Sequence, residues 1–76
     1  MARYNGYPSW PTWNVSLWVN NDEGLYRMAQ ECLNSKGYLQ ESAELMLWQL
    51  NSQGVTHTPD GAKYSVTSLK LAMRGI

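Results

Sequence analysis

The sequence predicts a mainly α-helical protein, a compact bundle of three to four helices with a short wing-like loop or minimal hairpin near residues 55–64. Two stretches between residues 22 and 52 repeat apolar residues at i, i+3, i+4 and i+7, which is the spacing of one helical face. No second long strand is available to pair with the one ambiguous segment. A length of 76 residues and a hydrophobic fraction of 43% fit a single domain over residues 1–76.

The first eleven residues contain one glycine and two prolines among aromatic residues. Because proline biases the residue before it toward extended geometry, residues 1–11 are predicted to be an arm and not a helix interior. We expect this arm to pack on the body through Tyr4, Tyr7 and Trp10. The alternative is an exposed aromatic strip that grips sugars, bases or proline-rich peptides.

The next segment has two interpretations. Alternating apolar residues over 13–19 are typical of a strand. A helix capped by Thr12 would instead place Trp13, Leu17 and Trp18 on one face. We favour the short helix, because a strand here would have no partner.

A second helix is predicted after Asn20 or Asn21 as its cap, with Asp22 and Glu23 in a first turn that favours negative charge. Its apolar face consists of Leu25, Met28, Ala29 and Cys32. The Asn-Ser-Lys-Gly sequence of residues 34–37 ends it.

A third helix is predicted from Leu39 to about Ser52, with Gly54 as a left-handed terminator. Its apolar face consists of Ala43, Met46, Leu47 and Leu50, and Glu41, Glu44 and Gln49 cover the outside. The turn sequence of residues 59–61 then predicts the loop or hairpin. Ser65 caps a last helix from Val66 to about Arg74, which buries Val66, Leu69 and Met73.

The sequence offers no constellation for chemistry. One cysteine and one histidine exclude a disulfide framework and the usual zinc sites. Cys32 falls on a buried helical face and His57 in a loop, so we do not expect them to form a catalytic pair. Glu41 and Glu44 read as a solvated helix face, and the isolated glycines form no phosphate loop. We therefore expect neither an enzyme nor a bound metal or cofactor.

Binding is the function class that remains. Nine aromatic residues and four methionines are too many for a chain of this size to bury fully, so some are expected to form a surface patch. The candidate protein-binding residues are Trp10, Trp13, Trp18 and Tyr26. The alternative is nucleic-acid binding, for which the candidates are Lys63, Ser65, Thr67, Lys70 and Arg74. Residues 36–76 carry an excess of only one positive charge, which is poor support for phosphate binding.

No charged start with an apolar run and no apolar stretch long enough to span a membrane occurs in the sequence. An unpaired cysteine suits a reducing compartment. These observations predict a protein of the cytoplasm without a membrane partner.

Residues 12–26 read T-W-N-V-S-L-W-V-N-N-D-E-G-L-Y. This segment resembles the recurring core T-W-N-V-x-L-W-x-x-N-D-E-G-L-Y of a family of small, mostly uncharacterised proteins encoded by phages and other mobile elements. The sequence matches every fixed position, and it departs just upstream, where Pro11 stands in place of an acidic residue. With the upstream Y-N-G-Y of residues 4–7 and W-P of residues 10–11, the resemblance spans residues 4–26, about a third of the chain, and implies an origin more than an activity.

The C-terminal part resembles the helix, loop and helix of the DNA-binding region of large serine recombinases, whose pattern is L-N-x-x-G-I, a glycine-rich basic loop and W-S-x-x-T-V. Here residues 50–55 read L-N-S-Q-G-V and residues 64–69 read Y-S-V-T-S-L, with Gly61 between them. Tyr64 replaces the tryptophan, and Asp60 stands where that loop is basic, so at most a winged-helix-like architecture carries over.

Together these features favour a phage or mobile-element accessory protein that acts by stoichiometric binding in the cytoplasm of a bacterial host. We expect its partner to be a host protein or nucleoprotein complex, inhibited or modulated by steric occlusion as anti-CRISPR proteins do. A small winged-helix-like DNA-binding regulator is the alternative, and a homodimeric structural component is the third interpretation.

Overall fold

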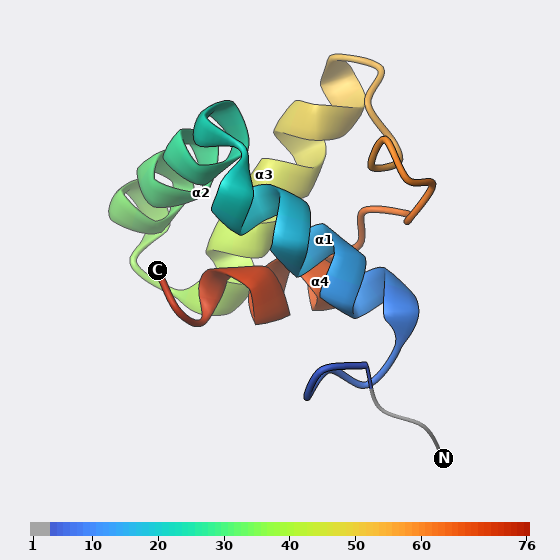
Figure 1. The fold of residues 1–76 in the computed structure, drawn as a ribbon. Coiled ribbons are helices and arrows are strands. Elements are labelled where there is room, and N and C mark those ends of the chain that lie inside the picture. Colours follow the sequence, from blue (N-terminus) through green and yellow to red (C-terminus); the bar gives the residue numbers. More distant parts are fainter. Residues whose placement is uncertain (1–3) are drawn as a thin grey trace.

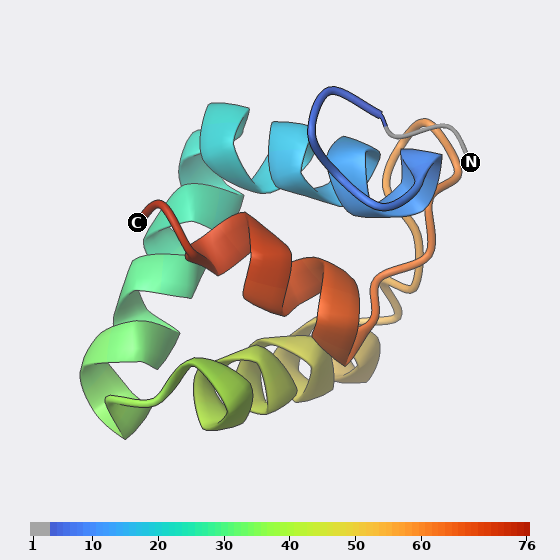
Figure 2. The same ribbon diagram turned by 90° about the horizontal axis from the view of Figure 1, so that it is seen from below.

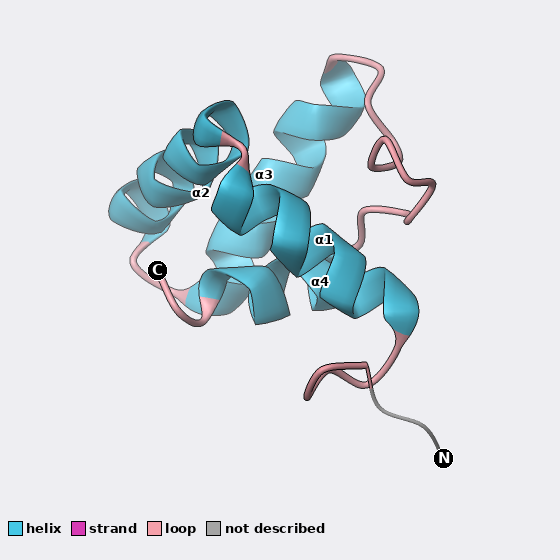
Figure 3. Cartoon of the chain, in the orientation of Figure 1, coloured by secondary structure: helices cyan, strands magenta, loops and turns pink. Residues whose placement is uncertain are grey.

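Four helices make up most of the protein (Figure 1). The computed structural model describes residues 4–76, and its helices are α1 (Trp10–Asn21), α2 (Glu23–Lys36), α3 (Leu39–Ser52) and α4 (Val66–Met73). Loops connect them, and the described residues contain no strand (Figure 3). The predicted mainly α fold class and the number of helices are confirmed.

Helix α4 crosses the middle of a frame that the other three helices form (Figure 2). It packs against both α1 and α3, while α2 packs against its two neighbours along the chain. Leu69 and Met73 of α4 are buried in one cluster with Val15 of α1 and Met46 of α3. The last helix is therefore the element around which the core is built.

Helix α1 begins earlier than predicted, and its cap is Ser9, not Thr12. The Ser9 hydroxyl accepts a hydrogen bond from the Thr12 N–H (3.4 Å), and the Thr12 hydroxyl accepts one from the Ser9 N–H (3.1 Å). This reciprocal pair is a capping box. Trp10 and Pro11 thus belong to α1 and not to an arm, because the first helical turn needs no proline N–H.

The buried face of α1 also differs from the predicted one. Trp13 and Trp18 are only partly buried and Leu17 is exposed, whereas the residues that face the core are Thr12, Asn14, Val15, Ser16 and Val19. Every buried polar side-chain atom of the described residues has a hydrogen-bond partner. The polar residues of α1 can therefore lie inside: Thr12 and Ser16 have partners nearby in the chain, and Asn14 has distant ones in Thr58 and Asp60.

The segment before α1 lies against that helix. The Tyr7 hydroxyl shares a 2.7 Å hydrogen bond with the Ser16 hydroxyl, and the Tyr4 ring lies 5.1 Å from the Trp13 ring. The first three residues of the predicted arm lie outside the described residues.

A single residue, Asp22, separates α1 from α2. Its N–H donates to the Trp18 carbonyl (2.8 Å) and so closes α1, while its side chain accepts from the Leu25 N–H (3.0 Å) and caps α2. The prediction of Asn20 or Asn21 as the cap was wrong, since both lie in α1. Asp22 can be the C-cap of α1 and the N-cap of α2 at once, because its backbone is extended and its carboxylate reaches the first turn of α2.

The ends of α2 and α3 were predicted correctly. Gly37 closes α2 in a left-handed conformation with φ of 78°. After α3, Gly54 has φ of 81°, and the Val55 N–H donates to the Leu50 carbonyl (2.9 Å), which together form a Schellman ending.

Residues 55–64, the hairpin loop, connect α3 to α4. His57 and Lys63 form an isolated antiparallel bridge, and the Thr58 N–H donates to the Ala62 carbonyl (2.8 Å). The predicted minimal hairpin is thus present as a single bridge. Ser65 then caps α4, as predicted, in a second capping box with Ser68.

Candidate functional site

Four side chains, Asn14, Trp18, Thr58 and Asp60, fasten the hairpin loop to α1, and we call this group the loop clip. The Asn14 amide and the Trp18 indole N–H each donate to the same Asp60 carboxylate oxygen, both at 2.9 Å. The Thr58 hydroxyl donates to the Asn14 side-chain oxygen (2.7 Å). It also accepts from the Ala62 N–H (3.0 Å), so the clip fixes both the position and the turn of the loop.

The clip explains why an acidic residue stands at the tip of this loop. The hydrogen bond from Asn14, and after it the one from Trp18, lower the pKa of the Asp60 carboxyl, so it is ionised in the folded protein. A carboxylate held this way binds α1 of the same chain. The hairpin is therefore an anchored loop, in contrast to the basic loop of the recombinase pattern.

Beside the clip lies an open groove of about 510 Å³, the hairpin groove, between the start of α2 and the hairpin loop. Its volume falls within the range of roughly 300–1,000 Å³ that ligand sites have. Its walls are mostly apolar side chains from four parts of the chain, which include Trp18, Leu25, Met28, Leu50, Val55 and Tyr64. Such a groove can hold the apolar part of a side chain, so it is the candidate binding site.

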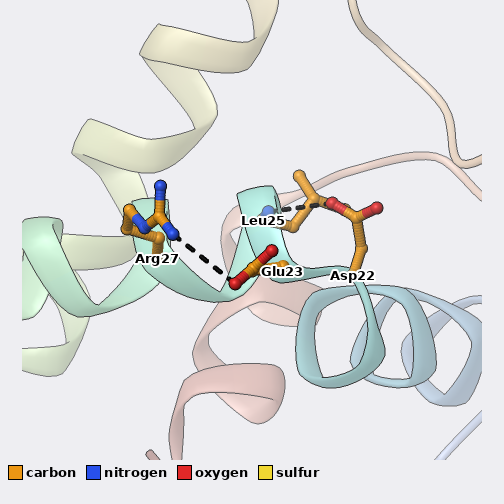
Figure 4. Close-up of polar contacts among 4 residues, drawn as sticks. All are labelled: Asp22, Glu23, Leu25 and Arg27. Atoms are coloured by element: carbon orange, nitrogen blue, oxygen red, sulfur yellow. Dashed lines mark hydrogen bonds and ion pairs between the residues drawn. The ribbon is translucent and has the colours of Figure 1, made fainter.

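The hairpin groove carries one negative charge. Asp22 is the only carboxylate among the described residues that line it, and no Lys or Arg lines it. Figure 4 shows that one Asp22 oxygen accepts from the Leu25 N–H, while the other carries no contact among the residues drawn. The nearby Glu23 carboxylate is paired with Arg27 at 3.6 Å (Figure 4).

The negative charge of Asp22 also affects Tyr64, another residue that lines the groove. Burial, and after it the negative charge of Asp22, raise the pKa of the Tyr64 hydroxyl. Tyr64 therefore stays neutral, and because it is only 3% exposed it offers a bound group little surface. His57 also lines this groove, and its ring shares a 2.9 Å hydrogen bond with the Thr56 hydroxyl.

The predicted protein-binding residues occupy different places. Trp10 packs against the core, Trp13 stacks with Tyr4, and Trp18 belongs to both the loop clip and the groove wall. Tyr26 is partly buried on α2. The structure thus brings one of the four, Trp18, into the candidate site.

The predicted nucleic-acid residues follow the loop and α4. Lys63, Thr67 and Arg74 are exposed, and Lys70 is partly buried in the last turn of α4. The Ser65 hydroxyl is occupied, because it caps α4 by accepting from the Ser68 N–H (3.1 Å).

The most exposed large aromatic residues were not predicted. Trp48 is 67% exposed and Tyr38 is 71% exposed, both at α3. Within the apolar run of α3, Trp48 falls outside the i, i+3, i+4, i+7 set, and that offset is the signal that marks it as outward-facing.

The residues described offer neither a reactive thiol in the groove nor a cluster of metal ligands. Cys32 is buried in the core, and burial, with a smaller effect of Glu31, raises the pKa of its thiol. Within residues 4–76, no three His, Cys, Asp or Glu side chains lie close enough together to hold a metal ion. None of the helices described is long and apolar enough to cross a membrane.

Fold and groove together define a small four-helix protein with an anchored hairpin and an apolar groove beside it. Over residues 1–75 the chain matches the family described as "Family of unknown function (DUF7249)", and it belongs to that family. No curated protein and no solved structure matches the chain.

Proposed function

We propose that this protein is a phage or mobile-element accessory protein that binds a host protein stoichiometrically and blocks one of its functional surfaces. The target is a component of a host defence nucleoprotein machine, met in the bacterial cytoplasm. The protein acts by occupying space and catalyses no reaction. The observation that carries the proposal is the exposure of Trp48.

Trp48 lies on the outer side of α3. The inner side of that helix packs into the core through Ala43, Met46 and Leu50, and the Trp48 ring takes no part in that packing. A tryptophan that is 67% exposed keeps a large apolar area in contact with water. Tryptophan is also the residue type most enriched among the residues that dominate binding energy at protein interfaces.

The surroundings of Trp48 fit an interface. Leu45, one turn before it, is partly buried, and Glu44 and Gln40 on the same side are exposed and hydrogen-bonded to each other at 2.9 Å. An aromatic centre with a polar rim is the usual layout of a binding patch.

The origin and the class of target in this proposal come from the resemblance of residues 12–26 to the phage-encoded family. Small phage accessory proteins often act by binding a host protein, and inhibition of CRISPR–Cas systems is a recurrent case. Fold alone does not assign that role, because one fold serves many functions.

The experiment is affinity capture from a host lysate treated with nuclease, washed at low and at high salt. We expect a host protein to be retained at a one-to-one ratio by the wild type and lost with Trp48→Ala. A central tryptophan contributes at least about 2 kcal/mol, which corresponds to an affinity loss of about thirtyfold. Gln30→Ala, an exposed change on α2 and outside this patch, is the control and should retain the partner.

Three results would overturn the proposal. Equal capture by the wild type and Trp48→Ala would show that α3 is not the interface. Recovery of nucleic acid that disappears at high salt would favour the DNA-binding regulator and direct mutations to Lys63, Lys70 and Arg74. A mass that doubles with protein concentration, without a host partner, would favour the homodimer.

A further inference from the structure

The hairpin groove combines apolar walls with a single uncompensated carboxylate. Among the described residues that line it, Asp22 supplies the only negative charge, and no Lys or Arg offsets that charge. One Asp22 oxygen caps α2, and the described residues give the carboxylate no other side-chain hydrogen bond or ion pair. The second Asp22 oxygen is therefore free to accept a hydrogen bond at the edge of the hairpin groove.

The charge and the apolar walls of the hairpin groove together determine which side chain fits it. An ammonium ion or a metal ion would match the charge but leave the walls formed by Leu25, Met28 and Val55 in water. A purely apolar side chain would cover those walls but would desolvate the Asp22 carboxylate without a partner, which is costly. A side chain with an apolar stem and a cationic end satisfies both.

The aromatic residue Trp18 favours arginine over lysine. Trp18 lines the groove and is only partly buried, and a guanidinium stacks on aromatic rings and is more weakly hydrated than an ammonium. The indole of Trp18 is held in place by its hydrogen bond to Asp60 (2.9 Å), so the ring is ordered before a ligand arrives. An ordered ring reduces the entropy lost on binding.

We propose that the hairpin groove binds an arginine side chain of the partner protein, with the stem on Leu25 and Met28 and the guanidinium between Asp22 and Trp18. This inference rests on the proposed function, because the arginine belongs to a protein partner. It adds a second contact, made by charge and stacking, on a different part of the surface from Trp48.

The test uses the whole protein, labelled with nitrogen-15, and short peptides as probes. The indole N–H of Trp18, assigned with Trp18→Phe, and the backbone N–H of Leu25 report on the groove by nuclear magnetic resonance. Acetyl-Leu-Arg-amide is titrated in, and acetyl-Leu-citrulline-amide serves as the uncharged probe of the same shape. We expect both signals to shift with the arginine probe, and the citrulline probe to bind about fivefold more weakly.

Two matched variants remove one negative charge each. Asp22→Asn keeps a good helix cap but loses the groove charge, and we expect it to weaken arginine binding by about threefold or more. Glu41→Gln removes a charge from the exposed first turn of α3, where Glu41 does not line the groove. We expect that variant to bind the arginine probe as the wild type does.

Several outcomes would overturn the proposal. These are equal binding of the citrulline and arginine probes, no shift at the solubility limit of the peptide, or an equal loss in both variants. Shifts confined to Trp48, or tighter binding of acetyl-Leu-Lys-amide, would do the same. If Asp22→Asn does not fold, the comparison of probes on the wild type still decides. Because no host protein is present, failure here leaves the lysate capture unaffected, and failure of that capture leaves this result standing.

Discussion

Replacing Asn14 with alanine removes the central residue of the loop clip and tests whether the clip holds the fold together. The Asn14 side chain is 2% exposed and Thr58 is 4% exposed. Truncation leaves the Thr58 hydroxyl without its acceptor, and an unpaired buried group costs about 1–3 kcal/mol. With the small cavity that remains, we expect a loss of about 2–3 kcal/mol in the free energy of unfolding.

That loss is small enough for the variant to remain folded, so it can be measured. A chain of 76 residues has a total stability of about 4–11 kcal/mol, so the variant should still fold at 25 °C. Urea unfolding followed by circular dichroism gives the difference directly. The exposed Asn51, on α3, provides the control, and Asn51→Ala should change stability by less than about 0.5 kcal/mol.

A double variant tests the mechanism. Because the Thr58 hydroxyl donates to Asn14 at 2.7 Å, the losses of Asn14→Ala and Thr58→Ala should overlap, and the double variant should lose less than their sum. Strict additivity, or a loss below about 1 kcal/mol for Asn14→Ala alone, would refute the argument.

Two further predictions concern acid and thiol chemistry. The hydrogen bonds from Asn14 and Trp18 hold the pKa of Asp60 below its ordinary value of 3.8, so the carboxylate stabilises the fold above that value, and the contribution is lost as pH falls through the folded-state pKa. From about pH 5 downward the wild type should therefore lose more stability than Asp60→Asn in urea titrations, and parallel curves would contradict this. Burial raises the pKa of the Cys32 thiol, so a thiol reagent at about pH 8 should label the native protein slowly and the urea-unfolded protein fast. Equal labelling rates would show that Cys32 is accessible.

The sequence was sufficient where local signals decide the structure. The bounds of α3 were predicted correctly because an apolar period and a following glycine are both local features. At the start of α1 two caps competed, and the reciprocal pair of Ser9 with Thr12 prevailed over Thr12 alone.

The buried polar side of α1 and the groove could not be predicted in the same way. Asn14 is stabilised inside by Thr58 and Asp60, which lie 44 and 46 residues further along the chain. The groove likewise exists only because the end of α1, the start of α2, the end of α3 and the hairpin loop meet. Such facts belong to the tertiary arrangement, and local periodicity does not contain them.

The position of α4 between α1 and α3 affects how the protein is made on the ribosome. Helix α1 is synthesised first, yet its partner α4 and the loop that satisfies Asn14 emerge last among the described elements. Helices α2 and α3 are neighbours in the chain and can pair during translation. The side of α1 that packs against α4 therefore stays uncovered until Met73 has been synthesised and released, and the nascent chain presents that side to chaperones throughout this period.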